Sequence, residues 1–92
     1  MFNTDKCLLK LIELLIFEKK VKSISDFAKS IGILEQTISK IKKGNSHFTV
    51  SQIQTICKVY NVNANWIFGM EKAVYNHKNS IEIDEFILHK HR

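Results

Sequence analysis

Apolar residues recur along this chain at the three- and four-residue intervals of amphipathic helices. The first such segment is expected to run from about Asp5 to Lys20, with Asn3 or Thr4 as its N-terminal cap. Its broad apolar face consists of Leu8, Leu9, Ile12, Leu15 and Ile16. The pattern predicts a helix that forms the scaffold of the core, and a helix lying on a membrane surface is the weaker alternative because the segment carries acidic residues.

A second and a third helix are predicted on either side of a tight turn. Ser23, followed three residues later by Asp26, has the spacing of a capping box at a helix start. The helix that follows is expected to bury Phe27, Ala28 and Ile31. Gly32 can adopt the left-handed conformation that ends a helix, and Leu34 or Glu35 begins the next one.

A fourth helix is expected to start at Thr49, because Gln52 stands three residues later as in another capping box. Its apolar positions, at helical intervals, are Ile53, Ile56, Cys57 and Tyr60.

A short fifth helix is predicted next. Asn61 is the expected C-terminal residue of the fourth helix, and Asn63 is the expected N-cap of the fifth. Trp66 and Ile67 should then point inward before Gly69 ends the helix. Because proline is absent and only three glycines occur, the expected fold class is all-α.

The predicted third helix, about residues 35–43, has two chemically different sides. Leu34, Ile38 and Ile41 are expected on an inner, apolar side. The opposite side carries Gln36, Ser39, Lys40 and Lys43, with Glu35 and Thr37 on the flanks. Amide, hydroxyl and ammonium groups can bind base edges and phosphates, although a merely solvated helix face has the same composition.

Charge is distributed unevenly along the chain, whose formal net charge is +5. Residues 1–69 contain ten lysines and five acids, whereas residues 70–92 contain four charges of each sign. A basic domain with a neutral extension suits a polyanionic partner, but a net charge of this size also occurs in proteins that bind no polyanion.

From Ser23 to Gly69 the chain resembles the helix-turn-helix domain of the lambdoid phage repressor and xenobiotic response element (XRE) family. The residues that carry this resemblance are "SISDFAKSIGILEQTISKIKKG", "TVSQIQTICKVYNV" and "NANWIFG". The resemblance implies a five-helix DNA-binding domain in residues 1–69, followed by a C-terminal extension in residues 70–92. It implies that double-stranded DNA is the partner and that the third helix enters the major groove.

The DNA contacts expected from this resemblance fall into two groups. The residues expected to contact bases are Glu35, Gln36, Ser39 and Lys40. Those expected to contact phosphates are Ser23, Thr37, Lys42, Lys43, Asn45 and His47. Glu35 has an equally weighted structural alternative, which is to stabilise the start of its helix.

The chain departs from the family pattern in three places. Leu34 stands where the family usually has a capping Ser or Thr, and Ile24 stands where phage repressors often carry a phosphate-binding glutamine. In addition, the contact face contains no arginine, since the lone arginine is Arg92. This composition favours A·T-rich or shape-dependent sites over strong guanine recognition.

Other chemistry is weakly indicated. Cys7 and Cys57 are expected to be reduced thiols in the core, and histidines 77, 89 and 91 lack the spaced partners of a metal site. No catalytic set is visible, so we expect neither an enzyme nor a cofactor. With no export signal and no membrane span in the pattern, we expect a cytoplasmic protein, and the resemblance implies a bacterial or phage origin.

The C-terminal segment "SIEIDEFILHKHR" can form a helix, or alternatively a strand beginning at Ile81. As a helix it presents Ile83, Phe86 and Ile87 on one stripe, which we expect to form a homodimer contact unless it packs back on its own domain. Three functional hypotheses remain: a DNA-binding regulator acting as a repressor, an antitoxin with a toxin protein as partner, and a protein-interaction module that binds no DNA.

Overall fold

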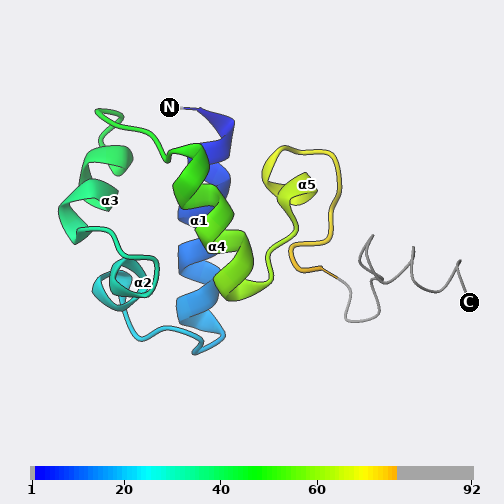
Figure 1. Ribbon diagram of the computed structural model, residues 1–92, viewed down its shortest axis with the longest axis horizontal. Helices are drawn as coiled ribbons and strands as arrows, with labels where there is room; N and C mark the ends of the chain where they lie inside the picture. Colours follow the sequence, from blue (N-terminus) through cyan, green and yellow to red (C-terminus); the bar gives the residue numbers. More distant parts are fainter. Residues whose placement is uncertain (1, 77–92) are drawn as a thin grey trace, which may run out of the picture.

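The computed structural model describes residues 2–76, and this part of the chain folds into five helices. They are α1 (Asn3–Phe17), α2 (Ile24–Ser30), α3 (Glu35–Lys42), α4 (Val50–Tyr60) and α5 (Ala64–Ile67). Figure 1 shows α2 and α3 on one side of α1 and α5 on the other. The predicted all-α class is confirmed, and none of the described helices is long and apolar enough to cross a membrane.

The predicted side-chain caps of α2 and α4 are confirmed. The Ser23 hydroxyl accepts a hydrogen bond from the Asp26 amide over 3.2 Å. Thr49 and Gln52 form a complete capping box, in which each side chain accepts from the backbone amide of the other residue. Such bonds satisfy amides at a helix start that have no partner within the helix.

The predicted bounds of α5 are also confirmed. Asn61 ends α4 in the left-handed conformation, with φ of 54°. Asn63 then caps α5 by accepting from the Asn65 amide over 3.1 Å, and Ile67 is buried. Trp66 is half-buried and packs against the core rather than lying fully inside it.

The predicted bounds of α1 were wrong at both ends. The N-cap is Phe2, whose side chain makes no capping bond, so neither Asn3 nor Thr4 has that role. The helix ends at Phe17 because Lys19 adopts φ of 62° and the Lys20 amide donates back to the Leu15 carbonyl over 2.9 Å. This is a Schellman ending made without glycine.

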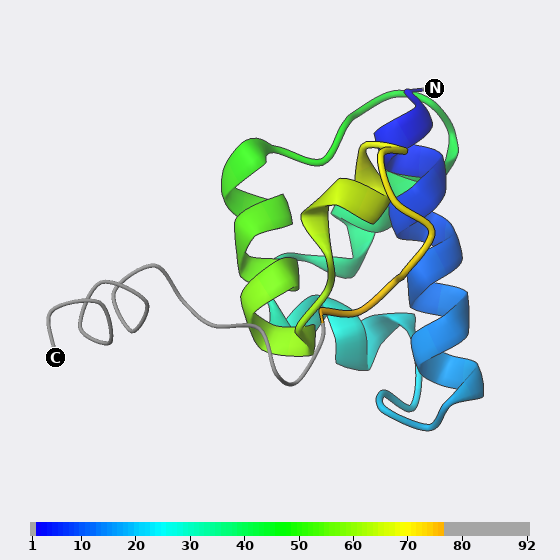
Figure 2. The same cartoon turned by 90° about the vertical axis from the view of Figure 1, so that its right-hand side faces the viewer.

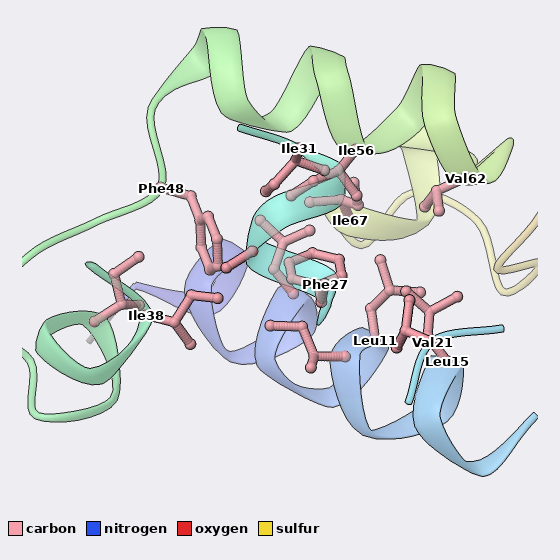
Figure 3. Packing of buried hydrophobic residues seen from close by; sticks show 14 residues of the cluster. Leu11, Leu15, Val21, Phe27, Ile31, Ile38, Phe48, Ile56, Val62 and Ile67 are labelled. Atoms are coloured by element: carbon pink, nitrogen blue, oxygen red, sulfur yellow. The ribbon is translucent and has the colours of Figure 1, made fainter. Parts of the chain in front are cut away.

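The core lies between α1 and α4, with Phe27 of α2 near its centre (Figure 3). The α1 side chains that are fully enclosed include Leu8, Leu11 and Leu15. Burial of Leu8, Ile12 and Leu15 confirms the predicted face, whereas burial of Leu11 was missed. Fully burying one such side chain contributes about 1.5–3 kcal/mol, so this cluster supplies most of the driving force for folding.

Residues 70–76 run from the end of α5 back to the C-terminal end of α4 (Figure 2). Val62 and Tyr75 form an isolated antiparallel bridge, and the Asn63 amide donates to the Val74 carbonyl over 2.8 Å. The Tyr75 hydroxyl donates to Glu18 over 2.6 Å. Burial and this carboxylate together raise the pKa of Tyr75 to about 12. The described part of the predicted C-terminal extension is therefore packed on the helical domain, and a domain boundary at residue 69 stays a prediction.

The remainder of that extension lies outside the described residues. This applies to the predicted terminal helix with Ile83, Phe86 and Ile87, and to histidines 77, 89 and 91.

Candidate nucleic-acid interface

The turn between α2 and α3 has the geometry that the sequence predicts. Gly32 has φ of 74°, and its amide donates to the Lys29 carbonyl over 3.2 Å. The Ile33 amide donates to the Ala28 carbonyl over 3.0 Å, which completes a Schellman ending of α2. Because a residue with a side chain rarely adopts this φ, glycine at position 32 allows the chain to enter α3 within a few residues.

The inner side of α3 rests on the core. Ile38 and Ile41 are both completely buried, as predicted. Leu34 was wrongly predicted to join them: it is 69% exposed, because it is the extended N-cap residue and does not follow the helical wheel. Its side chain cannot cap, so the expected lack of a side-chain cap at this helix start is confirmed.

The outer side of α3 is polar and accessible. The four residues expected to contact bases are all exposed: Glu35, Gln36, Ser39 and Lys40. Among residues 2–76, no hydrogen bond or ion pair engages these four side chains. A helix with one fully buried face and a free polar face can bind a groove without unfolding or breaking internal contacts.

The residues expected to contact phosphates are placed around α3 rather than on one surface strip. Lys42, Lys43 and Asn45 are exposed at the C-terminal end of α3, beside Gly44 with φ of 80°. Thr37 is half-buried on the flank of the helix.

Ser23 lies at the start of α2. It uses its hydroxyl oxygen for capping, so its hydroxyl hydrogen is the group that remains for an acceptor. The structure brings the lysines together at the end of α3 and leaves Ser23 on a different helix.

His47, the last of the residues expected to contact phosphates, is held by the start of α1. Its Nδ1 lies 2.6 Å from Oδ2 of Asp5, and its ring stacks on Phe2 with centroids 3.9 Å apart. The other Asp5 oxygen accepts from the Phe48 amide over 3.0 Å. Asp5 is only 1% exposed, and sequence reasoning had placed it merely at the beginning of a helix.

The Asp5 carboxyl titrates below its ordinary range. Burial by itself raises its pKa, but the hydrogen bond from His47, the bond from the Phe48 amide and the charge of His47 together outweigh burial. The pKa of Asp5 is therefore lowered, and the group is an anion at neutral pH. A buried anion thus ties the loop after α3 to α1.

An apolar groove of about 360 Å³ lies between α4 and α5. It is lined by Val50, Ile53, Gln54, Cys57, Lys58, Ala64 and Phe68. Val50 and Phe68 are 74% and 58% exposed, which is high for large apolar side chains. The Cys57 thiol is free, and burial raises its pKa, so it stays protonated. Sequence reasoning treated the fourth helix mainly as core and did not identify this groove.

Comparison with known families supports the nucleic-acid assignment. The family model of the Cro/C1-type HTH DNA-binding domain matches residues 10–71, which is more than half of the chain. This match includes all of α2, the turn, α3, α4 and α5. Searches against curated proteins and against solved structures gave no match.

Proposed function

We propose that this chain, which belongs to the family of Cro/C1-type helix-turn-helix DNA-binding domains, is a sequence-specific transcriptional repressor that inserts α3 into the major groove. The observation that carries this proposal is the division of α3 into two faces. Ile38 and Ile41 are buried completely, while Glu35, Gln36, Ser39 and Lys40 are exposed and have no side-chain partner among residues 2–76. Binding DNA therefore requires no rearrangement of the core.

Within α3 we assign base contacts to the exposed side of residues 35–40. Gln36 has the amide that pairs bidentately with adenine, and Lys40 donates to guanine or to phosphate. Ser39 lies between them and serves either partner. Glu35 lies in the first turn, where its charge is favoured by the helix dipole and where it can accept from cytosine.

Phosphate binding is assigned to the basic end of α3 and the loop that follows. Lys42, Lys43 and Asn45 are exposed there, and His47 follows them in the chain. Thr37 and Ser23 are proposed as hydroxyl donors at the edge of this surface. Because the described residues contain lysines and no arginine, we expect A·T-rich or shape-dependent operators.

We further propose that the protein binds DNA as a homodimer. One helix-turn-helix unit contacts too few base pairs to find a site in a genome, and two copies place their recognition helices about 34 Å apart. The stripe that the sequence predicts from Ile83, Phe86 and Ile87 is the first candidate for the dimer contact. The groove between α4 and α5 is the second, because Val50 and Phe68 expose apolar surface there.

The same groove supports one alternative function. An antitoxin of this fold needs a surface for a toxin protein in addition to a DNA-binding face, and an apolar groove of this size suits a partner side chain or helix. The two functions differ in their main partner, because a toxin would bind the groove whether or not DNA is present.

Selection of bound sequences from a random duplex pool, at a stated salt concentration, tests the main proposal. We expect enrichment of a two-fold symmetric motif whose half-sites are separated by about one helical turn. Enrichment of half-sites alone would contradict dimeric binding, and no enrichment would contradict sequence-specific binding.

A further inference from the structure

The ring of His47 is fixed on one edge and on one face. Its Nδ1 is held by Asp5 over 2.6 Å, and the Phe2 ring lies almost parallel to it, at 8°. The His47 side chain is nevertheless 44% exposed, so the ring keeps an accessible edge. Among residues 2–76, no hydrogen bond engages the other ring nitrogen, Nε2.

Asp5 determines which ring nitrogen carries the proton. One carboxylate oxygen accepts from the Phe48 amide, and the other faces Nδ1 of His47. An ionised carboxylate can only accept, so Nδ1 must be the donor. The neutral ring then has a lone pair on Nε2, and Nε2 gains a hydrogen only when the imidazole takes up a second proton.

A DNA phosphate can bind only one of these two forms. Phosphate oxygens are acceptors, so they are repelled by the Nε2 lone pair of the neutral ring. From the protonated ring they accept a charge-assisted hydrogen bond. The charged group that contacts the ring acts in the same direction, because Asp5 from α1 pairs with Nδ1 of His47 over 2.6 Å. Lys43, the basic residue nearest to His47 in sequence, is exposed at the end of α3.

We propose that Asp5 is a positioning residue that makes phosphate binding by His47 depend on protonation of the imidazole. This inference rests on the proposed DNA binding, and it means that the protein takes up a proton when it binds DNA. Asp5 itself touches no phosphate. It acts through the tautomer of His47, and DNA affinity therefore increases as the pH falls through the range in which histidine changes charge.

The test compares wild type, Asp5→Asn and His47→Gln on a mixed-sequence duplex of about 30 base pairs at low salt, because phosphate contacts do not require an operator. Fluorescence anisotropy gives the affinity of each between about pH 5.5 and 8. Wild type should bind roughly tenfold more tightly at the acidic end. For wild type, the slope of log affinity against log salt concentration should also be steeper by about 0.9 at the acidic end.

The two variants separate positioning from simple loss of charge. His47→Gln should lose the increase in affinity at low pH. Asn at position 5 keeps the bond to the Phe48 amide and can donate from Nδ2 to Nδ1 of His47, which moves the ring proton to Nε2. Asp5→Asn should therefore bind at pH 8 at least as tightly as wild type, with no further increase at low pH. Histidines 77, 89 and 91 are present in all three proteins, so only differences among the three proteins are interpreted.

A second readout needs no DNA. Nitrogen NMR of the His47 ring in the free protein should show the proton on Nδ1 in wild type and on Nε2 in Asp5→Asn. A proton on Nε2 in wild type, equal pH profiles for wild type and His47→Gln, or a wild-type profile in Asp5→Asn would each overturn the inference. If wild type binds no duplex at any pH, the proposed function fails instead, and the ring spectrum still decides the role of Asp5.

Discussion

Asp5 and His47 are 42 residues apart in the chain, yet Oδ2 of one lies 2.6 Å from Nδ1 of the other. Through this contact the first turn of α1 is tied to the loop that follows α3. The tie has consequences for stability, because the carboxylate is almost completely buried.

Replacing Asp5 by Ala should destabilise the fold at neutral pH by about 1–3 kcal/mol, because the Phe48 amide loses its buried partner. Since the folded-state pKa of Asp5 is lowered, its contribution is present above the unfolded value of about 3.9 and is lost as the pH falls through the folded value. Urea unfolding at several pH values measures this, with the exposed Glu13→Ala on the same helix as control. A difference between Asp5→Ala and wild type that stays constant down to the lowest pH would contradict the role of the charge.

Gln36→Ala and Lys40→Ala should each weaken binding to the selected operator by roughly 1–3 kcal/mol and relax its sequence preference. Both side chains are exposed, so unfolding by urea should shift by no more than about 0.5 kcal/mol. Titration of operator and scrambled duplexes measures the affinity and the sequence preference of each variant. Lys10→Ala, which removes an exposed lysine from α1, is the matched control and should leave the sequence preference unchanged. Unchanged affinity and preference in both α3 variants would show that the contact face is assigned wrongly.

Lys43→Gln should reduce affinity for all sequences by a similar factor, because a phosphate contact carries no base information. The slope of log affinity against log salt should become shallower by about 0.9, and Lys42→Gln should act in the same way. Lys10→Gln serves as the control for the loss of one positive charge. The assignment to phosphate would be refuted by a variant that changes base preference while its salt slope matches that of wild type.

Deleting residues 79–92 should convert a dimer into a folded monomer that binds DNA weakly and with little site preference. All five described helices remain in the shortened chain, so its circular dichroism and thermal unfolding should stay cooperative. Sedimentation at micromolar concentration compares the two forms. If the shortened chain still forms dimers, the groove between α4 and α5 becomes the expected contact, and Phe68→Ser should then give monomers.

Features that depend on neighbouring residues were predictable from the sequence. The caps at Ser23, Thr49 and Asn63 and the left-handed Gly32 were identified because each is made by side chains or φ angles within a few residues. The end of α1 was not predicted correctly, because Lys19 adopts a left-handed conformation that lysine rarely shows.

Features that depend on the folded arrangement were missed. Nothing local distinguishes Asp5 from other acids in a first helical turn, because its partners stand more than forty positions away. The exposure of Leu34 was missed for a different reason: a helical wheel assigns a direction to a residue that lies before the helix begins. The groove at Phe68 depends on how α5 packs beside α4, and that packing has no sequence signature of its own.

Both ends of α3 are set by the chain on either side of it. Gly32 ends the preceding helix, and Gly44, with the Asn45 amide donating to the Lys40 carbonyl over 2.9 Å, ends α3 itself. Ile38 and Ile41 are buried and fix the helix to the core, whereas Glu35, Gln36, Ser39 and Lys40 are exposed and fill no part of the core. Under the proposed function, substitutions at these four positions would redirect the protein to a new operator while the core of the domain stays unchanged.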